Sequence, residues 1–90
     1  MIDQRANPVA WALLGDELTD AQEHLAQLCL EMQQDPDFDE VDFRIWLAHI
    51  YSHLNRAWNR RNATDAQIPP EIEQATWDEW SQFPTDIEPL

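Results

Sequence analysis

The chain has 90 residues, a length that suits one small domain and limits the share of surface that folding can bury. Its 18 acidic residues are opposed by only five arginines and no lysine, giving a net charge of -13, which argues against direct binding to nucleic-acid phosphates. A hydrophobic content of 43% with 10% aromatic residues argues against global disorder.

The first predicted element is a long helix from about residue 8 to residue 34. Asn7 followed by Pro8 is typical of a helix start, with asparagine as the N-cap and proline at the first helical position. Apolar residues then recur at alternating steps of three and four, as in a heptad seam. The seam comprises Trp11, Leu14, Leu18, Ala21, Leu25, Leu28 and Met32. Gly15 costs about 1 kcal/mol relative to alanine, so we expect one helix with a kink there at most.

A turn and a second long helix follow. Pro36 ends the first helix, and the segment from about residue 39 to residue 61 has helical periodicity with an unusually wide apolar face. A smaller apolar patch, formed by Val41, Ile45 and Ala48, lies on nearly the opposite side of this helix. The short turn predicts that the two helices pack as an antiparallel hairpin.

The C-terminal third is predicted to be less regular. Residues 62–69 are rich in turn formers and end in a proline pair, so they form a linker. A short helical segment is predicted for about residues 70–83, with Thr76 and Glu79 as a capping box, and residues 84–90 form an acidic tail. The fold class is therefore all-α, a single domain of a two-helix hairpin plus a short C-terminal helical segment, with dimerisation into a four-helix bundle as a further option.

His49 and His53 are the only weak metal-ligand candidates that the pattern suggests. They are four residues apart on one helical flank, a spacing that allows two imidazoles to bind one ion. Asp20 and His24 can add ligands across the hairpin, but the helical wheel places both toward the outer edge of the first helix. Neither an HExxH nor an ExxH pattern is present, so the sequence predicts no metal and no cofactor.

No catalytic or cofactor-binding residue is predicted. The acidic run DPDFDE lacks the glycine and the final glutamate of a calcium loop, with Glu40 and Trp46 in their places. Cys29, the only cysteine, excludes an internal disulfide and falls within the arc of the seam, where we expect it to be buried and inert. With one glycine the chain has no phosphate-binding loop, and we expect no enzyme.

The sequence also indicates the cellular compartment in which the protein is expected. The N-terminus has no apolar core long enough for a signal peptide, and no run approaches the length of a membrane span. We expect a cytoplasmic protein without membrane contact.

Three functions fit these observations. The first is a protein-interaction or assembly module, binding another protein or a second copy of itself, because the hairpin leaves apolar residues uncovered. The expected interaction surface comprises Val41, Ile45, Ala48, Trp77, Trp80 and Phe83. The second is an acidic mimic of nucleic acid that binds a basic partner, and the third is a small metal-binding helical domain.

Overall fold

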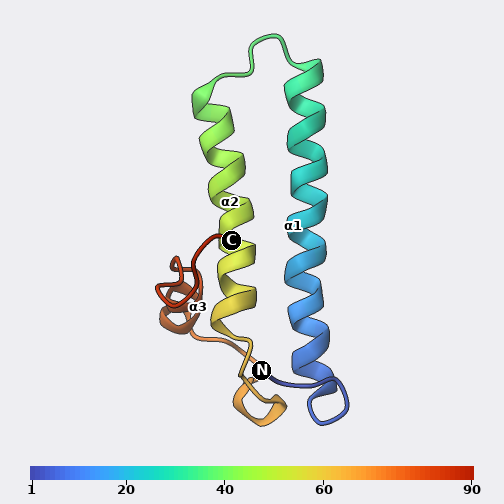
Figure 1. Cartoon of the computed structure of the whole chain (residues 1–90), viewed down its shortest axis with the longest axis vertical. Helices are drawn as coiled ribbons and strands as arrows, with labels where there is room; N and C mark the ends of the chain where they lie inside the picture. Colours follow the sequence, from blue (N-terminus) through green and yellow to red (C-terminus); the bar gives the residue numbers. More distant parts are fainter.

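A computed structural model describes all 90 residues and contains helices but no strands. Two long helices, α1 (Pro8–Gln34) and α2 (Glu40–Asn59), lie side by side and antiparallel, joined by a short turn (Figure 1). A 3-10 turn, η1 (Asp65–Gln67), and a short helix, α3 (Gln74–Trp80), complete the chain. The predicted all-α hairpin with a short C-terminal helix is therefore confirmed. No helix is both long and apolar enough to cross a bilayer.

The start of α1 is capped by a residue distant in sequence. Asn7 occupies the N-cap position, but its side chain makes no capping hydrogen bond. Instead, the carboxylate of Asp65 accepts hydrogen bonds from the backbone N–H groups of Ala10, at 2.7 Å, and Val9, at 3.4 Å. Asn7 Oδ1 accepts from the backbone N–H of Asp65 in return, at 3.0 Å. The free amides that any helix start presents are thus satisfied by η1, which fixes the linker against α1.

The start of α2 is capped locally. The Asp39 carboxylate accepts a hydrogen bond from the backbone N–H of Asp42, and the Asp42 carboxylate accepts one from the backbone N–H of Asp39. This reciprocal pair is a capping box in which aspartate replaces the more common glutamate. It fixes the point at which the chain re-enters helix after the turn.

Two small apolar clusters form the core of the hairpin. One contains Ile2, Ala10 and Leu14, and the other contains Ala21, Leu28 and Ile50. Between them in the sequence of α1 lies Glu17, which is only 6% exposed. It faces two other buried polar residues, His53 and Arg56, of α2. The centre of the hairpin is therefore a polar layer and not an apolar one.

Three of the seven residues of the predicted seam are buried. Leu14, Ala21 and Leu28 are at most 7% exposed, whereas the four alternate seam residues are between 37% and 53% exposed. Those four are Trp11, Leu18, Leu25 and Met32. Cys29 was expected to be buried and is instead exposed, because it lies beyond the exposed row, on the side away from α2.

The C-terminal segment packs on the second half of α2 (Figure 1). Two asparagines of α2 hold it: Asn55 donates a hydrogen bond to the Ser81 carbonyl, and Asn59 donates to the carbonyls of Trp80 and Gln82. Phe83 contacts the edge of Tyr51, with ring centroids 5.2 Å apart. The first half of α2 receives no such cover.

Candidate metal centre

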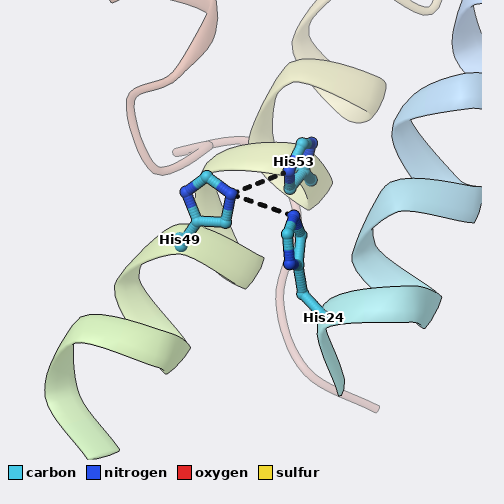
Figure 2. A group of neighbouring side chains, drawn as sticks. All are labelled: His24, His49 and His53. Carbon is cyan, nitrogen blue, oxygen red and sulfur yellow. Dashed lines mark hydrogen bonds between the residues drawn. The ribbon is translucent and has the colours of Figure 1, made fainter. Parts of the chain in front are cut away.

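Three histidines from the two long helices meet on one flank of the hairpin, beside the buried polar layer. His24 extends from the middle of α1, and His49 and His53 extend from successive turns of α2 (Figure 2). The antiparallel arrangement brings His24 opposite a pair that is 25 residues away in sequence. One ring nitrogen of each lies within 4.8 Å of the others, the spacing expected for ligands of one ion.

The nitrogen atoms have spacings close to those of a tetrahedral site. His49 Nε2 lies 3.1 Å from His24 Nε2 and 3.3 Å from His53 Nε2. Ligands that bind zinc tetrahedrally at 2.0–2.1 Å are separated by about 3.3–3.4 Å, so two of the three edges fit already. The third edge joins His24 and His53, whose rings are stacked with centroids 5.2 Å apart, and all three ligand atoms lie within 4.8 Å of one another.

Glu17 lies against the ring of His53. Its Oε2 lies 2.7 Å from His53 Nδ1, and its Oε1 accepts a hydrogen bond from Arg56 Nε at 2.9 Å. The Glu17 and Arg56 side chains are 8% and 7% exposed, so the pair is shielded from water. Arg56 Nη2, which can only donate, also lies 3.1 Å from His53 Nδ1. The contact with the ionised carboxylate is the shorter of the two, at 2.7 Å, and it favours the tautomer with its proton on Nδ1 and a lone pair on Nε2. That nitrogen points toward His49 (Figure 2).

Arg56 links this centre to α3. Its Nη1 donates a hydrogen bond to the Ser81 hydroxyl at 3.0 Å, and its guanidinium lies 4.2 Å from the centroid of the Trp77 ring. The guanidinium is therefore held on three sides, by Glu17, Ser81 and Trp77. This packing fixes the orientation of the carboxylate, which in turn fixes the orientation of the His53 ring.

A second buried arginine lies one turn further along α2. Arg60 is 4% exposed, its guanidinium lies 4.8 Å from the centroid of the Trp80 ring, and its Nη2 has no hydrogen-bond partner. Burial lowers the pKa of Arg60 from its ordinary value, Glu17 raises it, and Arg56 lowers it further. Glu17 is thus the nearest source of negative charge for two arginines.

His49 gives the centre its access to solvent. It is exposed, whereas His24 is half-buried and His53 is buried. Partial desolvation lowers the pKa of His49 from its ordinary value of 6.5. The cations His24 and His53, when protonated, and Arg56 act in the same direction, while Asp20 raises the pKa. The neutral imidazole, which is the form that binds metal, is therefore favoured.

The histidine pair singled out from the sequence is thus joined by His24, which the helical wheel had placed near the outer edge of α1. The structure turns it toward α2, against Trp46, with ring centroids 6.1 Å apart. Asp20 remains exposed and outside the cluster. Sequence reasoning missed Glu17 altogether. The available signal was its spacing of seven residues before His24, which puts both side chains on one face of α1.

The residues of the expected interaction surface are divided between α2 and the C-terminal segment. Val41 and Ile45 are each 63% exposed and Ala48 is exposed as well. Trp77 and Trp80 stack on the arginines of α2 and do not cover that patch. Phe83 is 65% exposed at the edge of Tyr51.

Comparisons with known proteins add no relative. None of the protein-family models matches the chain, and neither does any curated protein or solved structure.

Proposed function

We propose that this protein is a small helical zinc-binding domain. The observation that carries the proposal is the convergence of three imidazole nitrogens from α1 and α2, with His53 oriented by the Glu17 carboxylate (Figure 2). His24, His49 and His53 are the ligands, and each binds through a ring nitrogen. Glu17 and Arg56 form the surrounding shell.

Zinc fits the ligand type and the spacing together. Neutral imidazole suits zinc, copper, nickel and iron, and the N–N edges of 3.1 and 3.3 Å lie close to the separation of about 3.3–3.4 Å between tetrahedral zinc ligands. Three protein ligands leave a fourth position, and the exposure of His49 places that position toward solvent. Water is the simplest fourth ligand there.

The charges in and around the site also favour the binding of a cation. Glu17 and Arg56 neutralise each other, and three neutral histidines add no charge, so the ligand set itself is uncharged. The chain as a whole carries a net charge of -13. A divalent cation therefore approaches a molecule whose field attracts it, and its binding reduces the repulsion among the carboxylates.

The test is a calorimetric zinc titration of protein freed of metal with a chelator. One zinc per chain is expected for the wild type, and the single variants His24→Ala, His49→Ala and His53→Ala are each expected to lose the stoichiometric site. Replacing zinc with Co²⁺ reports the coordination geometry of the site, because tetrahedral Co²⁺ absorbs visible light far more strongly than octahedral Co²⁺. Glu23→Ala is the matched control, since Glu23 is exposed on the helix that carries His24.

The proposal fails if zinc binds with the same stoichiometry and affinity to all three histidine variants, because the ion is then held by surface carboxylates. It also fails if the wild type retains no zinc. Circular dichroism of each variant separates loss of binding from loss of fold. His49→Ala is the most informative variant here, since an exposed side chain contributes little to the core.

A further inference from the structure

The hairpin has a second flank that is apolar and uncovered. On α1 the exposed row Trp11, Leu18, Leu25 and Met32 repeats every seven residues. The buried residues Leu14, Ala21 and Leu28 separate this row from the row of Glu17 and His24, so the apolar flank faces away from the histidines. On α2, Leu54 and Trp58 join Trp11 and Leu18 in lining an open groove of about 400 Å³. These six residues are called the open face.

The open face is free of charge along α1, although one residue in five of the chain is acidic. The next row outward also repeats every seven residues and consists of Gly15, Gln22 and Cys29, none of which is charged at neutral pH. The row beyond it, Ala12, Thr19 and Ala26, is uncharged as well, and charged residues return only in the following row, with Asp16 and Glu23. A merely solvated surface of so acidic a protein would carry carboxylates here, as the rest of the helix does.

The surface area is large for a monomer of this mass. The chain exposes 6860 Å², whereas a monomer of this mass exposes about 5,500 Å². Its radius of gyration is 15.2 Å, against about 12 Å for a compact domain of the same length. The elongated hairpin therefore leaves more surface exposed than a compact domain of the same mass, and the open face is one apolar part of that surface.

We propose that the open face is a homodimer interface, through which two hairpins pack into a four-helix bundle. The exposed heptad row of one α1 packs against the open face of the second copy about a two-fold axis, so that each row is buried by its equivalent. The row spans 21 residues, or about 32 Å of helix, which is the extent of a bundle core. The histidine flanks and α3 remain outside the interface.

A second copy fits this face better than other occupants. A basic protein partner would be attracted to the carboxylates, and the open face has none along α1. A small ligand can fill the groove near Trp11 and Leu18, but it leaves Leu25 and Met32 exposed. A copy of the same chain offers an apolar face of equal length. The one cation that lines its groove, Arg61, stacks on Trp58 and is already paired with Asp86.

Sedimentation equilibrium in the presence of a chelator tests the proposal. The wild type is expected to sediment as a dimer at micromolar concentration. Leu18→Glu combined with Leu25→Glu is expected to weaken dimerisation by more than about 100-fold, because it places unpaired charges in the interface. Both side chains are about half exposed within one chain, so the helix content of the variant should match the wild type.

Leu30→Glu is the matched control, since Leu30 is 41% exposed on the outer side of the same helix. It should leave the dimer intact. A wild type that is monomeric at every concentration overturns the proposal. So does a dimer that survives the double variant, or one that dissociates with Leu30→Glu or Ile45→Glu, because a different face then forms the contact. The chelator keeps this result independent of zinc binding.

Discussion

Glu17→Gln is the sharpest probe of the centre, because it changes one atom of a residue that touches no metal. The carboxylate accepts two hydrogen bonds, from His53 Nδ1 at 2.7 Å and from Arg56 Nε at 2.9 Å. An amide has only one acceptor oxygen. If that oxygen stays with Arg56, the amide N–H group faces His53 Nδ1 and favours the tautomer protonated on Nε2. The proton then occupies the lone pair that zinc requires.

Two effects of different size follow. Loss of a carboxylate that orients a metal-bound histidine weakens metal binding by about 10- to 100-fold, which corresponds to about 1.4–2.7 kcal/mol. Independently, Arg56 is left buried without a full counter-charge, and breaking a buried pair in this way costs about 3–5 kcal/mol of stability. The second effect is present without metal, and the first appears only when zinc is added.

The assay is a pair of thermal melts, with chelator and with zinc in excess. For the wild type, zinc at 100 times its dissociation constant adds about 2.7 kcal/mol, which raises the Tm by about 10–20 °C. Glu17→Gln should melt lower in chelator and gain less from the same zinc concentration. Glu23→Gln makes the same chemical change at an exposed position of α1 and should match the wild type in both melts. If zinc raises the Tm of Glu17→Gln by as much as it raises the Tm of the wild type, the carboxylate does not orient His53 for metal binding.

Three further predictions concern the residues around the centre. Arg56→Met should destabilise the metal-free protein by about 3–5 kcal/mol, because it leaves a buried carboxylate without its partner. Arg60→Met should cost less than about 1 kcal/mol in chemical denaturation, because it removes a buried guanidinium nitrogen that has no hydrogen-bond partner. Because the pKa of His49 is lowered in the folded state, the unfolded chain binds its proton first as pH falls below 6.5, and stability must decline there. Urea titrations at several pH values in chelator should therefore show a shallower acid decline for His49→Ala, and an equal decline contradicts the shift. Asp65→Ala should lower stability by about 1 kcal/mol through loss of the α1 cap, and Asn7→Ala should cost less if Asp65 is the dominant cap.

The helices follow from sequence because their signals are local. Pro8 marks the first residue of α1, Pro36 lies in the turn that follows it, and heptad spacing fixes which side of α1 faces its partner. The cap of α1 does not follow in this way. Asn7 has the right type and position, yet Asp65 supplies the hydrogen bonds. A residue 55 positions away can be identified only once the linker is folded back onto the helix.

Only part of the candidate centre could be predicted from the sequence, because only part of it depends on local signals. His49 and His53 are one turn apart, so their proximity is a property of a single helix. The approach of His24 and Glu17 to α2 depends on how α1 is rotated about its axis and shifted along it relative to α2. A helical wheel drawn for one helix contains neither quantity. Glu17 lies beside the seam in a row that continues with His24 and Glu31, and such a row of polar residues is typical of a solvated side of a helix. Its burial is a tertiary effect, stabilised by Arg56 and His53.

The buried polar layer is difficult to explain as a device for stability alone. It separates two apolar clusters of three buried residues each, in a chain too short to form a large core. Replacing a buried ion pair by apolar residues of similar volume is often neutral or stabilising, by about 1–4 kcal/mol. A layer retained only for folding should therefore be improved by Glu17→Leu, His53→Leu and Arg56→Met together. Because Arg60 also loses its nearest counter-charge in this variant, Arg60→Met is added. We expect the resulting quadruple variant to be at least as stable as the metal-free wild type in urea, and unable to bind zinc. If it unfolds instead, the layer is a structural requirement of the hairpin, and the orientation of His53 is a by-product of packing.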